Sequence, residues 1–323
     1  MVTISDIEAA ARVIAPHVHR TPLLTSATFD ALTGNTTFFK AENLQRIGAF
    51  KIRGAYNKIA SLTDAERARG VIAHSSGNHA QGVALASNLF GIAATVVMPH
   101  NSVPNKLEAT KGYGANVVLC EDSTDDRERV TSELIERHRY VLIHPYNDEK
   151  LIAGQGTVAL ELFQDVKDLD VLFVPVGGGG LIAGCAVAAK HFSSTVRVIG
   201  VETEGANDCY QSFRAGRIIK IPAANTIADG MRTLSVGPIN FEIMQRCVDD
   251  VITVGDADVL RMMKFFYERM KVVVEPTGAV APAAALVNAL GLRGKRIGAV
   301  ISGGNVDPAL LQRVFEVPAI KPK

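Results

Sequence analysis

The chain has 323 residues, of which 34 are lysine or arginine and 33 are aspartate or glutamate, so its net charge is +1. Charged residues make up 21% and hydrophobic residues 47%, which excludes a disordered chain and provides for a large core. The near-zero net charge excludes the long-range field that attracts nucleic acid or anionic lipid. At roughly 150 residues per domain, the length suggests about two domains.

The sequence carries no recognisable targeting or membrane segment. No apolar stretch reaches the roughly 18 residues that a membrane span needs, and the N-terminus lacks the basic start and apolar run of a signal peptide. The four cysteines are far apart and show no paired metal-binding spacing, which is typical of free thiols in a reducing compartment. The sequence therefore predicts a cytoplasmic α/β protein of enzyme size.

Short β-rich segments alternate with helical patterns along the chain. Ser5 and Glu8 form a capping-box pattern and predict a first helix near the N-terminus. Several later segments are apolar on both alternating faces, as buried parallel strands are. Strands are predicted at 70–73, 94–98, 116–119, 140–143, 171–174, 197–201 and 296–301. Helices are predicted at 78–89, 104–112, 123–137, 180–190 and 256–270.

This alternation predicts an α/β fold with doubly wound parallel sheets. Four of the expected strands lie between residues 70 and 143, which is enough for a small sheet of their own. We therefore expect two open-sheet domains. The small domain comprises residues 70–143 and is inserted into a large domain of residues 1–69 and 144–323.

A glycine loop follows the strand expected at 171–174 and opens a helical pattern. It consists of Gly177, Gly178, Gly179, Gly180 and Leu181. Glycine lets successive backbone N–H groups approach an anion, and the helix N-terminus adds about half a positive charge, so we interpret the loop as a phosphate cradle. The loop also fits a loose dinucleotide fingerprint, with Glu202 where a ribose-binding acid would lie. An NAD-dependent oxidoreductase stays open at this point.

Lys51 lies among small and apolar neighbours, not in a run of charges. Partial desolvation favours the neutral amine, which attacks carbonyl groups. Alternatively, the side chain lies along a helix surface with its charge in water. This segment alone does not decide between the two.

Two further polar turns follow predicted strands. The first could bind a carboxylate through hydroxyl, amide and helix-start N–H groups, although an ordinary helix cap has the same composition. It contains Ser75, Ser76, Gly77, Asn78 and His79. The second is a glycine turn that begins with Ser302, after the strand at 296–301.

Taken together, these segments resemble the fold type II pyridoxal-phosphate (PLP) enzymes of the serine/threonine dehydratase and serine racemase group, which share a tryptophan synthase β-like fold. The similarity runs from about His19 to about Leu311. It implies PLP instead of NAD as the cofactor, attached to Lys51 with Phe50 beside the ring. The glycine loop would then hold the cofactor phosphate.

The resemblance also implies roles for the polar turns. Asn78 would bond the ring hydroxyl and Ser302 the pyridine nitrogen, and Glu275 would lie near the ring. The substrate carboxylate would be surrounded by Ser75, Ser76, Gly77, Asn78 and His79.

The implied activity is that of an ammonia-lyase on L-serine, L-threonine or a related 3-hydroxy amino acid, giving a 2-oxo acid and ammonia. Lys51 would remove the α-proton. Ser76 stands where many threonine dehydratases have alanine, and in racemases of this group that serine serves the opposite face, so serine racemisation is a second expected activity. Arg127 matches a family arginine that can reach a substrate's distal group, which favours 3-hydroxyaspartate; a surface arginine on a helix is an equal alternative.

Two alternatives to this activity within the family are a true serine racemase and an L-threo-3-hydroxyaspartate dehydratase. A PLP-carrying protein that binds without turnover is a third class.

The resemblance further implies a divalent cation, Mg²⁺ or else Ca²⁺ or Mn²⁺, bound by the side chains of Glu202 and Asp208 and the carbonyl of Ala206. It implies a small amino-acid substrate and a homodimer. For ATP as an effector the indications are mixed. Gln81, Tyr113 and Asn305 match positions near the nucleotide site of animal racemases. Arg46 and Ile47 differ from the residues that line that site. The chain has no room for the regulatory domain of biosynthetic threonine dehydratases, so feedback inhibition by isoleucine is not expected.

Overall fold

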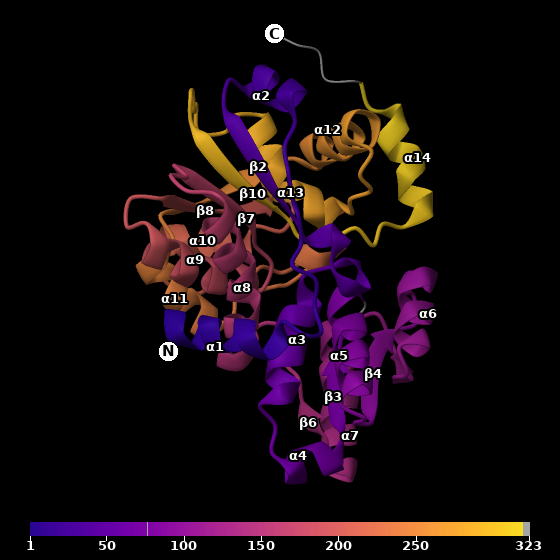
Figure 1. Cartoon of the computed structure of the whole chain (residues 1–323). Coiled ribbons are helices and arrows are strands. Elements are labelled where there is room, and N and C mark those ends of the chain that lie inside the picture. The colour runs from indigo at the N-terminus through magenta and orange to yellow at the C-terminus, as the bar shows by residue number, and fades with distance from the viewer. Residues whose placement is uncertain (76, 319–323) are drawn as a thin grey trace.

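Two sheets organise the chain, and the computed structural model describes residues 1–75 and 77–318 (Figure 1). The larger sheet has six strands in the order β1-β2-β10-β7-β8-β9. Its strands are β1 (Leu23–Leu24), β2 (Thr36–Ala41), β7 (Val171–Pro175), β8 (Arg197–Thr203), β9 (Asp250–Val254) and β10 (Arg296–Ile301). All neighbours pair in parallel except β1 and β2.

The smaller sheet has four parallel strands in the order β5-β4-β3-β6. They are β3 (Val71–His74), β4 (Ala94–Pro99), β5 (Asn116–Cys120) and β6 (Val141–Leu142). Figure 1 shows this sheet in the lower part of the molecule and the larger sheet above it.

Fourteen helices in the described part of the chain connect and cover the strands. They are α1 (Ile4–Ile14), α2 (Ala27–Thr33), α3 (Lys51–Ala60), α4 (Asp64–Arg69), α5 (Asn78–Leu89), α6 (Pro104–Gly112), α7 (Thr124–His138), α8 (Glu149–Asp165), α9 (Gly180–Phe192), α10 (Asp208–Ala215), α11 (Pro238–Cys247), α12 (Asp256–Phe265), α13 (Pro276–Leu286) and α14 (Pro308–Glu316). Short helical turns are η1 (Glu42–Leu44), η2 (Arg46–Gly48), η3 (Asp229–Met231) and η4 (Phe266–Met270). Within the described residues, none of these helices has the length and apolar character to cross a membrane.

The larger sheet is buried on both faces, and its central strand β7 is apolar at every position. Leu172 and Val174 of β7 point into a core with α1, α8, α9 and α11. The alternate residues, Val171 and Phe173, point into a second core with α2, α12, α13 and α14. This is the doubly wound arrangement that continuous apolar strands require.

The smaller sheet is also covered on both faces. Val71 and Ala73 of β3 pack in a core with α5, whereas Ile72 faces α7. The first core also contains residues of α3, which in turn packs against α8 below the larger sheet. Helix α3 therefore lies between the two sheets, and the domain boundaries at 70 and 143 stay a prediction.

The predicted start of the first helix was wrong by two residues. Thr3, not Ser5, is the N-cap, and its capping partner is Asp6, not Glu8. The Thr3 hydroxyl accepts from the Asp6 N–H at 3.3 Å, and the Asp6 carboxylate accepts from the Thr3 N–H at 3.0 Å. The pairs Thr3/Asp6 and Ser5/Glu8 both have the spacing of a capping box. The start at Thr3 places Asp6 in the first turn, where the helix dipole favours a negative charge.

A largely buried ion network fixes the start of α3. Arg53 donates from Nε to Glu42 at 2.8 Å and from Nη1 to Glu161 at 2.7 Å. Lys40, also buried, donates to the other oxygen of Glu161 at 2.6 Å. Two cations and two carboxylates balance, and they join β2, η1, α3 and α8. Because losing one member leaves an opposite charge uncompensated, the network constrains the backbone two residues after Lys51.

We expect Arg53→Met to lower the free energy of unfolding by about 3–5 kcal/mol, because Glu42 loses its cation and Glu161 keeps only one. Urea unfolding followed by circular dichroism measures this. The matched control is Arg20→Met, which breaks an ion pair whose side chains are 51% and 38% exposed. That change should cost less than about 1 kcal/mol. Equal losses in the two variants would contradict a structural role for the network.

Candidate active site

A cavity of about 720 Å³ opens at the carboxyl ends of β3, β7 and β10. Parallel sheets commonly bind ligands at this edge, where the loops after neighbouring strands meet. The cavity brings together most of the predicted site residues: Phe50, Lys51, Ser75, Gly77, Asn78, His79, Arg127, Gly177, Gly178, Gly179, Gly180, Leu181 and Ser302. Glu275 lies just behind this lining, in contact with Asn78. Ser76 lies outside the described residues.

Lys51 is the first residue of α3, and its amine points into the cavity. Its Nζ donates to the carbonyl of Pro145 at 2.8 Å. Burial of the side chain lowers the pKa of Lys51 to about 8. At pH 7 such a lysine holds roughly a tenth of its amine in the neutral, nucleophilic form, far more than a lysine with an ordinary pKa does.

The loop that leads to Lys51 is held by the turn after β10. The Phe50 N–H donates to the Ser302 carbonyl at 3.1 Å. Earlier in the loop, Ile47 has a φ of 62°, a left-handed conformation that costs a β-branched residue about 1–3 kcal/mol. The Asn305 side chain holds it there by donating to the Ile47 carbonyl at 2.7 Å.

The glycine loop leaves no room for side chains. A Cβ on Gly177 would lie 2.9 Å from the carbonyl of Gly230, and one on Gly178 would overlap the Tyr146 ring at 2.2 Å. Gly179 has a φ of 91° and caps α9. Its four glycines therefore line the cavity with backbone alone, which lets an anion approach the start of α9 closely, as an anion site requires.

Two further polar groups that line the cavity, Ser302 and Asn78, differ in how they are satisfied. The Ser302 hydroxyl is buried and has no hydrogen-bond partner among the described residues, so it is available to a ligand. The Asn78 amide has two partners. Its Nδ2 donates to Glu275 at 2.5 Å, and its Oδ1 accepts from Asn305 at 2.8 Å. One N–H of Asn78 remains for a further acceptor.

His79 is a neutral imidazole with a fixed tautomer. Its Nε2 lies 2.9 Å from the Ile143 carbonyl and must therefore carry the proton. Burial, reinforced by the nearby Lys51 charge, holds the pKa of His79 well below its usual range. The remaining ring atom, Nδ1, is unpartnered in the part of the chain that the structure describes. The His79 side chain can thus offer a ligand an acceptor, but not a second donor.

Arg127 and His74 form a basic corner of the cavity. The Nε of Arg127 is buried and makes no hydrogen bond within residues 1–75 and 77–318. Burial lowers the pKa of His74 to about 4, and His144 and Arg127 add to this effect. His74 is therefore neutral, and Arg127 supplies the positive charge. Such a corner suits a ligand with a second anionic group.

The predicted cation ligands lie away from this cavity. The Glu202 carboxylate accepts from the N–H groups of Cys209 at 3.1 Å and Tyr210 at 2.6 Å. Both carboxylate oxygens of Asp208 are buried without a partner in the described residues. Burial raises the pKa of Asp208 to about 7, and burial followed by the Asp208 charge raises that of Glu202. No cluster of three or more His, Cys, Asp or Glu side chains occurs in the described chain, so any cation here would need carbonyl and water ligands as well.

Lys106, Tyr146 and Asp229 are among the cavity-lining residues whose place in the site was not predicted from the sequence. The Tyr146 ring packs on Gly178. Lys106 and Thr110 are the two buried residues of α6. Residues four apart lie on the same face of a helix, so this spacing is compatible with a buried face. The sequence did not reveal this buried face because both side chains are polar, and polar residues usually lie on the exposed face of a helix.

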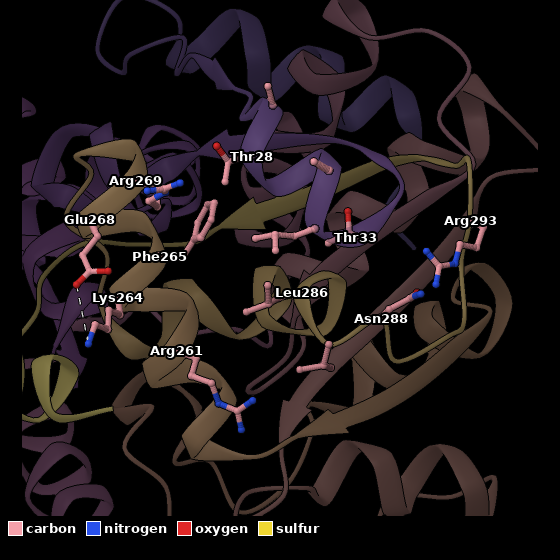
Figure 2. Close-up of a pocket in the computed structure, with 14 residues that line it drawn as sticks. Thr28, Thr33, Arg261, Lys264, Phe265, Glu268, Arg269, Leu286, Asn288 and Arg293 are labelled. Carbon is pink, nitrogen blue, oxygen red and sulfur yellow. Dashed lines mark ion pairs between the residues drawn. The ribbon is translucent and has the colours of Figure 1, made fainter. Parts of the chain in front are cut away.

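A second cavity, of about 790 Å³, lies between α2, α12 and α13. Figure 2 shows Phe265 and Leu286 on its floor and Arg261, Arg269 and Arg293 around its edge. None of the predicted site residues lines it, so the chemistry expected from the sequence belongs to the first cavity.

Comparison with known proteins agrees with this geometry. The family of pyridoxal-phosphate-dependent enzymes matches residues 14–303. The chain belongs to this family. It is similar to L-threo-3-hydroxyaspartate ammonia-lyase of Saccharomyces cerevisiae, with 47% identity over 94% of each chain. It is 44% identical to L-threonine ammonia-lyase of Thermotoga maritima over 99% of this chain and 80% of that protein.

A solved structure of maize serine racemase also matches, with a TM-score of 0.93 and 44% identity over 97% of each chain. The predicted family and the fold type II α/β architecture are confirmed, and PLP, not NAD, is the cofactor of the family. The site fits this cofactor. Ser302 offers an unused buried hydroxyl, and the glycine loop is a cradle that any Cβ would fill.

The lowered pKa of Lys51 predicts how this PLP-dependent enzyme takes up its cofactor. Below pH 8 the amine is mostly protonated and cannot attack the cofactor aldehyde, so the attachment rate should rise about tenfold per pH unit and level off above about pH 8. Stopped-flow absorbance after mixing apoprotein with PLP measures this rate. Lys51→Ala should show no attachment. A rate that keeps rising to pH 10 would mean that Lys51 retains an ordinary pKa.

Proposed function

We propose that the protein is a PLP-dependent ammonia-lyase that converts L-serine, L-threonine or a related 3-hydroxy amino acid into a 2-oxo acid and ammonia. The observation that carries this proposal is the meeting of four groups in one cavity. They are the Lys51 amine, the glycine loop, the Ser302 hydroxyl and the turn from Ser75 to His79. The three similar proteins described above include two ammonia-lyases, which supports elimination as the main reaction.

When bound, PLP supplies an electron sink for charge that develops at the substrate α-carbon. The protein's own groups then decide the outcome. Ser75 and the backbone N–H groups at the start of α5 bind and orient the substrate carboxylate. Lys51, whose burial favours the neutral amine, takes the α-proton. Ser302 donates a hydrogen bond to the ring nitrogen without transferring a full charge, which limits the depth of the sink and favours loss of the β-hydroxyl.

The basic corner favours one substrate in particular, 3-hydroxyaspartate. Arg127 lines the cavity with a buried Nε that has no partner within the described residues. A substrate with a second carboxylate would satisfy this donor and compensate the charge. The similarity to the yeast L-threo-3-hydroxyaspartate ammonia-lyase supports the same candidate.

Racemisation of serine is the second activity that we propose. It requires a proton delivered to the face opposite Lys51, and we assign that role to Ser76 on the family resemblance. The similarity to maize serine racemase supports it. A serine hydroxyl is a weak acid, so a neighbouring group or water must assist it.

The proposed function is tested with a substrate panel of L-serine, D-serine, L-threonine and L-threo-3-hydroxyaspartate. The protein should be yellow when purified with PLP, and borohydride should fix the label on Lys51. Wild type should release 2-oxo acid from the L-substrates, whereas Lys51→Ala should lose both label and turnover. Chiral chromatography reports D-serine formed from L-serine, which Ser76→Ala should abolish.

Arg127→Gln is the variant that separates the substrates. It should raise KM for 3-hydroxyaspartate about tenfold or more, since a charge-assisted bond is lost, and leave KM for threonine nearly unchanged. A colourless protein without 2-oxo acid production would refute the proposal. Equal effects on both substrates would remove 3-hydroxyaspartate as the favoured one.

We propose a divalent cation, Mg²⁺ with Ca²⁺ or Mn²⁺ as alternatives, at Glu202, Asp208 and the carbonyl of Ala206. Two neighbouring buried carboxylates need a compensating cation, and the unpartnered oxygens of Asp208 are free to bind one. Because these residues lie outside the cavity, the cation would support the fold and not the chemistry.

Removal of the cation should therefore lower stability and activity together. EDTA is expected to reduce both the melting temperature and turnover, and Mg²⁺ or Ca²⁺ should restore both. Asp208→Ala should make the protein indifferent to the chelator. An EDTA effect of unchanged size in Asp208→Ala would place the cation elsewhere.

We also propose a homodimer in the cytoplasm. Leu44 and Val273 are about half exposed, at 48% and 49%, and lie on neighbouring segments joined by the Asn43 side chain, as expected of a partly apolar contact surface. The four free cysteines in the described chain are in keeping with a reducing compartment. ATP as an effector remains a prediction from the resemblance.

A further inference from the structure

Lys106 joins the two halves of the molecule behind the active site. It lies on α6, next to the smaller sheet, and only 3% of the residue is exposed. Its Nζ forms an ion pair with Asp229 in η3 and lies 3.5 Å from Glu275, the N-cap residue of α13. Both carboxylates belong to segments around the larger sheet. The mechanism above does not use this contact.

Glu275 connects Lys106 to Asn78 because its two carboxylate oxygens contact one residue each. One carboxylate oxygen of Glu275 faces Lys106, and the other accepts from Asn78 Nδ2 at 2.5 Å. Asn305 donates to Asn78 Oδ1 at 2.8 Å, so the amide of Asn78 cannot rotate without losing both bonds. The orientation of the remaining Asn78 N–H therefore depends on Glu275 as the acceptor, and an ionised carboxylate makes this bond stronger than a neutral carboxyl group does.

The charge state of Glu275 depends in turn on Lys106. The charged groups that face Glu275 from the described residues are Lys106 of α6 and Asp229 of η3, and the polar ones are Asn78 of α5 and the backbone of Gly303. Burial raises the pKa of Glu275, the Lys106 charge opposes this, and the Asp229 charge adds to it. Without Lys106, burial and the Asp229 charge both favour a protonated Glu275.

Lys106 also lies against the turn that we assign to the substrate carboxylate. A Cβ on Gly77 would be 3.6 Å from Lys106 Nζ and 4.0 Å from Asp229 Oδ2. The same ammonium group is thus adjacent to the cofactor side and to the substrate side of the cavity.

We propose that Lys106 is a positioning residue: through Glu275 it holds the Asn78 amide toward the cofactor ring oxygen, and this rests on the proposed function. Lys106 does not touch the reacting atoms. Its removal changes the hydrogen bonding at the ring oxygen because a protonated Glu275 no longer accepts in the same way from Asn78.

The test compares Lys106→Met with Lys111→Met, a matched change of an exposed lysine on the same helix. Apoprotein is titrated with PLP, and the visible absorption band of the loaded protein is followed against pH. Lys106→Met should raise the Kd of PLP about tenfold, since Asn78 loses a charged acceptor. It should also give the band a new titration, that of Glu275, which is absent from wild type and Lys111→Met. Glu275→Gln/Lys106→Met should remove this titration, and Lys106→Arg should restore the wild-type band.

Several outcomes would overturn the inference. One is a Lys106→Met protein with the Kd and the pH profile of Lys111→Met. Another is weaker binding without a new titration, because a merely structural role would produce that. If Lys106→Met does not fold, the Glu275→Gln variant is measured instead. A wild-type Kd for PLP and a wild-type absorption band in that variant would refute the positioning role of Lys106 through Glu275. A wild type that binds no PLP would instead refute the proposed function itself.

Discussion

The buried network of Arg53, Lys40, Glu42 and Glu161 is the constraint on which the active site depends. These largely buried charges tolerate little displacement, since Arg53 bridges Glu42 and Glu161 and Lys40 pairs with Glu161, all at 2.6–2.8 Å. Arg53 lies one residue beyond Ile52 on the first turn of α3, so the network also fixes where Lys51 begins the helix. The position of the Lys51 amine thus depends on the buried ion pairs of Arg53, although the amine itself forms no ion pair with a described residue.

The strand order accounts for the rest of the site. β7 and β10 are neighbours in the larger sheet, although more than a hundred residues separate them along the chain. Their carboxyl ends therefore place the glycine loop beside Ser302. The turn after β3 reaches the same cavity from the smaller sheet, and α3 lies between the two. A reactive centre assembled from both sheets needs their mutual position to be well defined, and Lys106 contributes one contact across that boundary.

Patterns within a short window predicted most elements. Helices α5 and α6 have their predicted bounds, and the apolar runs of β4, β7 and β10 were recognisable because both faces are buried. Strand β2 was missed because it contains Lys40, whose burial depends on Glu161, 121 residues later. In the same way, Lys106 meets Glu275 169 residues away. A single sequence supplies the residue types for such pairs, but the pairing itself arises only from tertiary structure.

The conformation of Ile47 has a consequence for synthesis of the chain. This residue is held in a left-handed conformation by Asn305, 258 positions later, and strand β2 pairs with β10 over a similar separation. On a ribosome, the segment before Lys51 emerges early and has no partner until the last strand has been made. The edge of β2 that pairs with β10 therefore stays unpaired for most of translation, while β1 can already pair with the other edge. The reactive lysine reaches its final setting only after nearly the whole polypeptide has been made.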